Sequence, residues 1–365
     1  MTGKYNKKII LEDGQEYYGY SFGSDQEKIL EIVFNTSMVG YQEILSDPSY
    51  TDQAVVMTYP IIGNYGMADD DYETDISTIG ALVVHEYNDE PSNFRSAKTL
   101  RQVMSQYGIS GICGVDTRKL TRSIRDYGSR KALLTDAETP LEKGLCKLKD
   151  FVLPRNAVSR VSCRSSREVG GSEAKFHVVA IDCGMKHNIV RSLVKRGCRV
   201  TIVPWDTTHE YIRSIDPDGI FISNGPGDPT DVPQTVNTIK SLIGSYPIFG
   251  ICLGHQIISL AYGAKTYKLK FGHRGGNHPV KDIETGRIEI TSQNHSYAVD
   301  EDSLIGTPLI VTHRNLLDGT VEGIKCQSDQ IFSVQYHPES APGPQDSTHL
   351  FDRFYKMMED NKAHA

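Results

Sequence analysis

Apolar and polar positions in the C-terminal half of the chain fall into two alternating kinds of segment. Short apolar runs predict buried strands at residues 177–182, 199–203, 219–224 and 248–251. Between and after them, apolar side chains at helical spacing predict helices at residues 188–196, 232–243 and 257–261. Strands that alternate with helices predict an α/β fold with a doubly wound, mostly parallel central sheet. Ligands of such sheets collect at the carboxyl ends of the strands.

The pattern changes after residue 265. Shorter alternating strands with polar turns are expected there, followed by a strand at residues 331–336 and a closing amphipathic helix at 349–361.

The pattern in the N-terminal part predicts a separate mixed α/β domain over residues 1–155. Strands are expected at 8–12, 31–34, 54–59 and 79–84, and helices at 93–107 and 117–126. Residues 156–175 are rich in Ser, Arg, Gly and Glu and predict a polar linker. A second domain is therefore expected over residues 176–365.

Composition narrows the classes of partner. The 365 residues are 38% hydrophobic and 23% charged, and the net charge of −7 disfavours nucleic-acid and membrane partners. No apolar run approaches the roughly 18 residues that span a bilayer. The seven cysteines are scattered without a CxxC pair, which favours a reducing cytoplasm and no zinc site. The acidic run at 69–71 is interpreted as a solvated loop, so no metal is predicted.

Cys252 is the candidate nucleophile. It follows the apolar run 248–251 and precedes a helical pattern, with Gly250 and Gly254 on either side. This strand–turn–helix arrangement resembles a serine nucleophile elbow with sulfur in place of oxygen. Glycines remove Cβ atoms where the backbone bends sharply, and a helix N-terminus favours a thiolate. A small apolar residue at a strand end is the alternative interpretation of Cys252.

His337 is the candidate acid and base, and Glu339 its orienting carboxylate. The sequence His337-Pro338-Glu339 ends the expected strand 331–336, and residues two apart on a strand project to the same side. Glu339 can therefore set the tautomer of the ring and stabilise its charged form. His255, one helical turn after Cys252, is a rival base without a carboxylate placed to orient it.

The segment Gly225-Pro226-Gly227 follows another strand of the expected sheet. One of its amides, together with the N–H of Leu253, could form an oxyanion hole, although a tight turn alone would also explain the glycines. The sequence contains neither a Gly-x-x-x-x-Gly-Lys-[Ser/Thr] loop nor a Gly-x-Gly-x-x-Gly segment after a strand. Binding of ATP or a dinucleotide by this chain is therefore not expected.

Together these motifs resemble a known family. The sequence Gly250-Ile251-Cys252-Leu253-Gly254-His255-Gln256 with His337-Pro338-Glu339 is similar to class I glutamine amidotransferases. Further segments resemble the small subunits of glutamine-dependent carbamoyl-phosphate synthases over nearly the whole chain. They are the segments at residues 34–45, 47–50, 58–60, 62–64, 116–122, 223–229, 270–280 and 293–295. The N-terminal segments are specific to this family, whereas many amidotransferases share the C-terminal ones.

The resemblance implies a swivelling β/β/α-type N-terminal domain followed by the amidotransferase domain. It also implies that Ser49 reaches from the first domain to the L-glutamine substrate. Where many relatives carry Gly-Phe after the Asn-His pair, this chain has Ser-Tyr. The remaining positions that match substrate contacts are Gly225, Gly227, Leu253, Gln256, Asn294, Ser296 and Tyr297.

The implied activity is hydrolysis of glutamine through a cysteine thioester, with delivery of ammonia to a large subunit. That subunit would hold ATP, Mg²⁺ and bicarbonate and make carbamoyl phosphate for arginine and pyrimidine biosynthesis. This chain itself would carry no cofactor. The expected assembly is a cytoplasmic heterodimer, from which higher-order assemblies can form.

Three alternatives remain at this point. The chain could be the glutaminase component of another amidotransferase, such as an anthranilate or GMP synthase, although residues 1–155 argue against it. It could be a non-catalytic regulatory subunit, which the intact Cys252, His337 and Glu339 disfavour. It could also be a cysteine peptidase on the same fold, which would need a pocket open to polypeptides.

Overall fold

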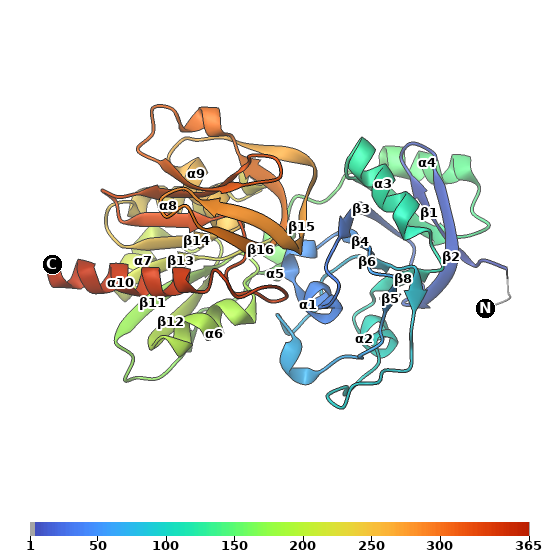
Figure 1. Ribbon diagram of the computed structural model, residues 1–365, viewed down its shortest axis with the longest axis horizontal. Helices are drawn as coiled ribbons and strands as arrows, with labels where there is room; N and C mark the ends of the chain where they lie inside the picture. Colours follow the sequence, from blue (N-terminus) through green and yellow to red (C-terminus); the bar gives the residue numbers. More distant parts are fainter. Residues whose placement is uncertain (1–3, 365) are drawn as a thin grey trace. The chain divides into compact units, whose positions relative to one another are not determined.

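The computed structural model describes residues 4–364 and divides into two compact units, residues 1–154 and 155–365 (Figure 1). Each unit is described separately. Within residues 4–364, no helix combines the length and the apolar character that a membrane crossing requires.

The first unit is built around a closed barrel with strand order β1-β2-β8-β6-β4-β3-β9. The barrel strands are β1 (Lys7–Leu11), β2 (Glu16–Gly23), β3 (Lys28–Asn35), β4 (Gln53–Met57), β6 (Ala81–Val83), β8 (Ser110–Cys113) and β9 (Arg130–Asp136). Strands β5 (Ile61–Ile62) and β7 (Glu86–Tyr87) form a separate pair. The helices are α1 (Tyr41–Ser46), α2 (Leu100–Gln106), α3 (Thr117–Tyr127) and α4 (Leu141–Asp150).

Helix α2 is shorter than the sequence predicts. The prediction of a helix over 93–107 is wrong in its first half, because the helix begins only after Thr99. Thr99 and Gln102 form a capping box, in which each side chain accepts a hydrogen bond from the other residue's backbone N–H. The cap satisfies amides that a longer helix would otherwise bond internally, so the helix begins directly after Thr99.

The second unit contains a ten-stranded sheet within residues 4–364, in the order β10-β12-β11-β13-β14-β19-β18-β17-β15-β16. Strands β12 (Cys198–Pro204), β11 (Phe176–Asp182), β13 (Gly219–Ile222), β14 (Ile248–Ile251) and β19 (Ile331–Val334) pair in parallel. The expected α/β fold with a mostly parallel central sheet is therefore confirmed. Antiparallel pairing extends the sheet through β10 (Arg167–Val169), β18 (Val321–Cys326), β17 (Ile310–Asn315), β15 (Thr266–Asp282) and β16 (Ile288–Val299).

Alternate residues of the parallel strands fill two cores, one on each face of the sheet. Ile220 and Ile222 of β13 pack on one face, whereas Phe221 between them packs on the other. Helices α7 (His209–Ile215), α8 (Pro233–Leu242) and α9 (Leu253–Ala261) cover the first face, and α6 (His187–Lys195) and α10 (His349–His364) cover the second (Figure 1). The strand period of two thus produces three layers.

Two sequence expectations need correction in this unit. The stretch 156–175 contains α5 (Ala157–Val161) and β10, so it is more structured than a polar linker. Ala157 and Val158 are buried, and β10 pairs antiparallel with β12. Of the strands after residue 265, β15 (17 residues) and β16 (12 residues) are long instead of short, because register shifts let their pairing continue past local irregularities. Strands β17, β18 and β19 are short, as expected.

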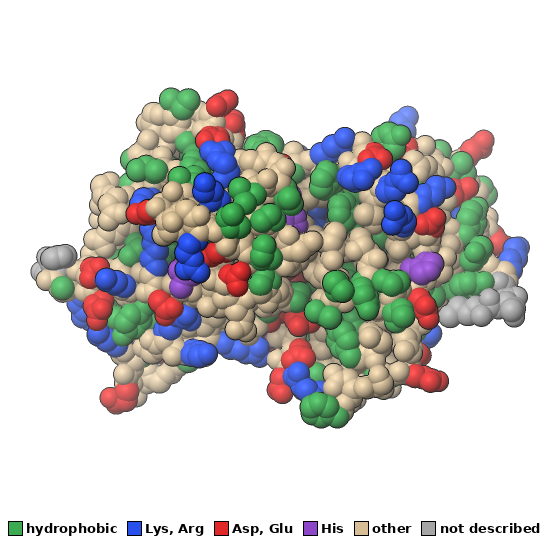
Figure 2. Space-filling view, in the orientation of Figure 1, with side chains coloured by type: hydrophobic (Ala, Val, Ile, Leu, Met, Phe, Trp, Pro, Cys, Tyr) green, Lys and Arg blue, Asp and Glu red, His purple; other side chains and the backbone are tan. Residues whose placement is uncertain are grey.

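Charges of both signs are interspersed over the face of the molecule that Figure 2 shows. The seven cysteines, all within the described residues, are free thiols.

Candidate active site

Cys252 lies between β14 and α9 in a strained backbone conformation, with φ 55° and ψ −103°. A non-glycine residue with positive φ costs on the order of 1–3 kcal/mol and persists only where its surroundings enforce it. The Cys252 N–H donates to the Val334 carbonyl at 2.9 Å, which ties the turn to β19. Cys252 is 2% exposed. The predicted strand–turn–helix elbow is present.

The two flanking glycines are required by space. A Cβ on Gly254 would lie 2.3 Å from the Ile222 carbonyl oxygen, and one on Gly250 would lie 2.6 Å from Ile258 Cδ1. Contacts this short do not occur for real Cβ atoms, so only glycine lets α9 approach the ends of β13 and β14.

His337 and Glu339 form a buried pair beside the thiol. His337 Nδ1 donates to Glu339 Oε1 at 2.7 Å, as the two-residue spacing predicts. Burial disfavours the charged ring, but the negative charge of Glu339 and hydrogen bonds with Cys252 and Glu339 raise the pKa of His337 above its ordinary value. Since Nδ1 is engaged, Nε2 faces the thiol, and it has no other partner in the described part of the chain.

Lys186, which no sequence motif indicated, completes this group. Its Nζ lies 3.0 Å from Glu339 Oε1 and donates to the Ala341 carbonyl at 2.6 Å. Burial would raise the pKa of Glu339, but the charges of Lys186 and His337 hold it below its ordinary value. Its position in the sequence could have indicated a role in the site, because Lys186 follows the carboxyl end of β11, where ligand sites of parallel sheets collect.

The loop after β13 lies against the elbow. The Gly254 N–H donates to the Ser223 carbonyl at 3.1 Å, and a Cβ on Gly225 would lie 2.8 Å from Leu253 Cδ2. Gly227 has φ 89°, which favours glycine at that position. The amide of Leu253 belongs to the first turn of α9, whose N–H groups have no acceptor within the helix. The two predicted oxyanion donors therefore lie on neighbouring segments, one on the loop after β13 and the other at the start of α9.

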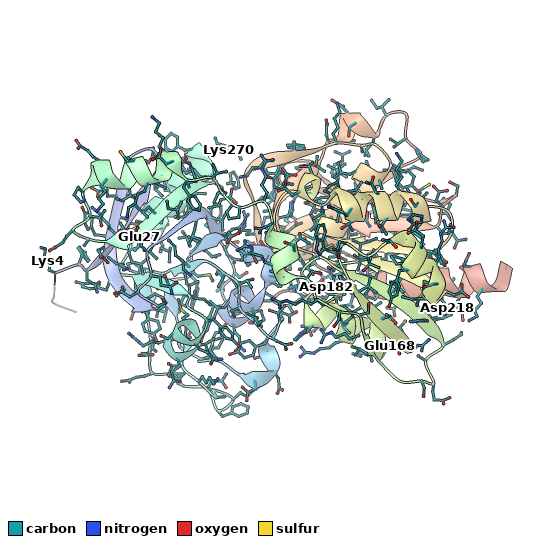
Figure 3. All side chains as sticks on the ribbon, turned by 180° about the vertical axis from the view of Figure 1, so that it is seen from behind. Lys4, Glu27, Glu168, Asp182, Asp218 and Lys270 are labelled. Carbon is teal, nitrogen blue, oxygen red and sulfur yellow. The ribbon has the colours of Figure 1, made fainter. Side chains whose placement is uncertain are left out.

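Asp182 ends β11 close to this group of loops and is labelled in Figure 3. Its carboxylate accepts hydrogen bonds from the N–H groups of Cys163, Gly184 and Met185. The Asp182 side chain thus holds the loop that leads to Lys186 through two of that loop's backbone N–H groups.

The segment 294–297 of β16 carries three of the predicted glutamine contacts. The Cys252 thiol donates to the Asn294 carbonyl with a sulfur–oxygen distance of 3.6 Å. Gln256 Nε2 donates to the Tyr297 carbonyl at 2.9 Å, so Gln256 and Tyr297 contact each other directly. Ser296 Oγ accepts from Arg274 Nη2 at 2.5 Å. These residues lie together around the nucleophile, whereas their binding of glutamine remains a prediction.

Ser49 belongs to the first unit. It lies in the short 3₁₀ helix η1 (Pro48–Tyr50), where its N–H donates to Asp47 Oδ1 at 2.9 Å. Its proposed contact with glutamine also remains a prediction.

A buried polar network supports the segment 294–297 from β15 and β18. His273, His295 and Glu322 place one possible metal-ligand atom each within 4.8 Å of one another. Burial opposes a charge on His273, but Asp318 and Glu322 raise its pKa to about 9, and a protonated ring cannot bind a metal. His295 Nδ1 donates to the Tyr297 carbonyl at 2.8 Å. The network therefore supports the segment 294–297 through hydrogen bonds, whereas the absence of a metal stays a prediction.

His255 is the rival base from the sequence. Its Nδ1 forms a 2.9 Å hydrogen bond with Ser333 Oγ, and burial lowers the pKa of its ring to about 3. It packs between α9 and β19 as a neutral side chain.

Comparison with known proteins agrees with this geometry. The family model "Glutamine amidotransferase class-I" matches residues 179–357, a range that includes the elbow at Cys252 and the pair His337 and Glu339, and the chain is a class I glutamine amidotransferase. The model "Carbamoyl-phosphate synthase small chain, CPSase domain" matches residues 9–134.

Three relatives named as carbamoyl phosphate synthase small chains match almost the whole chain. The small chain of Fusobacterium nucleatum is 52% identical, over 98% of this chain and 99% of its own length. The pyrimidine-specific small chains of Halalkalibacterium halodurans and Bacillus subtilis are 52% and 49% identical, over 98% and 97% of this chain and 99% and 96% of their own lengths. The chain belongs to the family of small chains of glutamine-hydrolysing carbamoyl phosphate synthases.

Proposed function

We propose that this chain hydrolyses L-glutamine at Cys252 and delivers the ammonia to a carbamoyl phosphate synthase large chain. The large chain would use bicarbonate and Mg²⁺-bound ATP, and this chain would hold no cofactor. The observation that carries the proposal is the strained elbow at Cys252 with the buried group His337, Glu339 and Lys186 beside it.

The first half of the reaction releases ammonia. With its proton held by His337, the Cys252 sulfur attacks the side-chain amide carbon of glutamine as a thiolate, and the carbonyl oxygen becomes an oxyanion. The N–H groups of Leu253 and of the Gly225 loop would hold that oxyanion, and one such donor is worth on the order of 3 kcal/mol. His337 gives a proton to the departing nitrogen as the carbon–nitrogen bond breaks, leaving a glutamyl thioester on Cys252.

The second half restores the thiol. His337, now neutral, takes a proton from water, whose oxygen attacks the thioester carbon. The carbon–sulfur bond breaks, glutamate leaves, and the proton returns to the Cys252–His337 pair. Glu339 and Lys186 keep the ring in place through both halves.

Glutamine would be bound by Ser49 of the first unit and by residues of the second. Those of the second unit are Gly225, Gly227, Leu253, Gln256, Asn294, Ser296 and Tyr297. Ammonia is mostly protonated at neutral pH and then lacks its nucleophilic lone pair. It must therefore pass to the large chain shielded from water, within a cytoplasmic heterodimer or a larger assembly of it.

The product would serve pyrimidine and arginine biosynthesis. The pyrimidine part is supported by the two relatives whose names specify pyrimidine. The arginine part follows from the wider resemblance to the family.

The substitution Cys252→Ser tests the proposal in the complex with the large chain. Glutamine-dependent synthesis of carbamoyl phosphate should fall by at least about 10³-fold, because the oxygen nucleophile is not matched to this site. Synthesis from added ammonia should stay at the wild-type rate, which also shows that the complex has assembled. Substantial glutamine-dependent synthesis by the variant would show that Cys252 is not the nucleophile.

A further inference from the structure

Arg274 is a buried cation on β15, next to the strand that carries the predicted glutamine contacts. The residue is 3% exposed. Nη1 donates to the Phe271 carbonyl at 2.7 Å, and Nη2 donates to Ser296 Oγ at 2.5 Å. A buried guanidinium is costly unless it is hydrogen-bonded, so these two bonds constrain both of their acceptors.

The backbone around Arg274 is irregular in a way that brings it onto β16. Residues 268 and 273 of β15 are separated by a register shift, after which His273 pairs with His295 and Arg274 pairs with Asn294. Lys270, labelled in Figure 3, lies within this irregular stretch. Gly272 has φ 70°, and a Cβ there would lie 2.4 Å from the His295 carbonyl oxygen and 2.5 Å from Arg274 Nη1. The bulge therefore packs tightly against residues 295 and 296.

Residues 294–297 connect this bulge to the nucleophile. The Asn294 carbonyl accepts the hydrogen bond of the Cys252 thiol, and the Tyr297 carbonyl accepts one from Gln256 on α9. Arg274 holds Ser296, which lies between these two contacts. A shift of Ser296 would move both neighbouring backbone groups relative to Cys252.

We propose that Arg274 is a positioning residue for glutamine binding, which acts by clamping Ser296 to the bulge of β15. The inference rests on the function proposed above and adds a residue that would set the affinity for the substrate. Arginine suits this role because its planar, forked donors reach two acceptors at once, whereas the single ammonium of lysine acts as a point charge.

The test is glutamine-dependent steady-state kinetics of the complex with the large chain. Arg274→Lys keeps the charge but loses the fork, and it should raise KM for glutamine about tenfold while changing kcat little, as expected for a lost charge-assisted hydrogen bond. Ser296→Ala should raise KM in the same direction. The double variant should be no worse than the more affected single variant, because both changes break the same contact.

Controls separate a local effect from general damage. Lys270→Ala removes an exposed cation from the same bulge and should leave KM within about twofold of wild type, as expected for a surface change. Ammonia-dependent synthesis should be unchanged in every variant.

An unchanged KM in both single variants would overturn the proposal, and so would fully additive effects in the double variant. If wild-type glutamine turnover did not depend on Cys252, the proposed function would fail instead, so the two failures can be told apart. Ser296→Ala keeps the proposal falsifiable even if an Arg274 variant fails to fold.

Discussion

At the scale of single residues, the two histidines near Cys252 have opposite environments. His337 is buried beside the Glu339 carboxylate, which raises the pKa of its ring despite the cost of burial. His255 is also buried, and burial, together with the charge of the nearby His313, lowers the pKa of its ring to about 3. At neutral pH the first can donate a proton to a leaving group, whereas the second stays neutral.

This difference predicts unequal effects of the same substitution. His337→Asn should lower kcat for glutamine hydrolysis by about 10²–10⁴-fold, the usual contribution of a general acid and base. His255→Asn is the matched control and should lower kcat less than about tenfold, measured on protein shown to be folded by circular dichroism. Larger damage from His255→Asn than from His337→Asn would reverse the assignment of the base.

The contact of Lys186 with Glu339 could not be predicted from the sequence. The pair His337 and Glu339 could be predicted because both lie on one strand end at a spacing with a known side-chain direction. Lys186 lies about 150 residues away in sequence and contacts Glu339 only through the folding of the sheet. Its burial, at 2% exposed, has no counterpart in the local pattern of apolar and polar residues.

At the scale of elements, the elbow depends on close approach of α9 to two strands. Gly254 permits that approach, since a Cβ there would meet the carbonyl of Ile222 on β13 at 2.3 Å. The backbone of a strand cannot move aside as a flexible side chain can.

We expect Gly254→Ala to lower the free energy of unfolding by about 1–3 kcal/mol, the usual cost of overpacking. It should also remove most of the glutaminase activity, because the turn that exposes Cys252 would be displaced. Gly171→Ala is the control, since its nearest atom would be 4.0 Å from the new Cβ, and it should change stability by less than about 0.5 kcal/mol. Chemical denaturation measures the free energy of unfolding of the two variants. Equal stabilities of Gly254→Ala and Gly171→Ala would contradict the packing argument.

The parallel strands could be predicted because each is a short, continuous apolar run between turn residues. Elements whose start, length or existence depends on individual contacts could not be predicted in this way. The capping box at Thr99 shortens α2, and register shifts in β15 extend a strand that the polar pattern seemed to interrupt. Strand β10 depends on its pairing with β12, which no local pattern shows.

At the scale of the whole molecule, each described core cluster draws its residues from one unit. The two clusters around the parallel sheet contain only residues after 155, and those of the first unit only residues before 154. The single tryptophan, Trp205, packs against a core of the second unit. Its fluorescence therefore reports on that unit alone.

Residues 155–365 produced alone should fold, because the two core clusters described around the parallel sheet are built from residues of this unit. The fragment should show a cooperative urea transition in Trp205 fluorescence and a near-ultraviolet circular dichroism spectrum typical of packed aromatic rings. A broad transition without such a spectrum would show that the second unit needs the first to fold.

The most direct test of the central claim is to trap the covalent intermediate. The wild-type complex is mixed with glutamine, quenched in acid within a turnover, digested and examined by mass spectrometry. We predict a glutamyl thioester on the peptide that contains Cys252, and its absence from Cys252→Ala together with loss of glutamine hydrolysis. A glutamyl adduct on another residue, or continued glutamine hydrolysis by Cys252→Ala, would contradict the account.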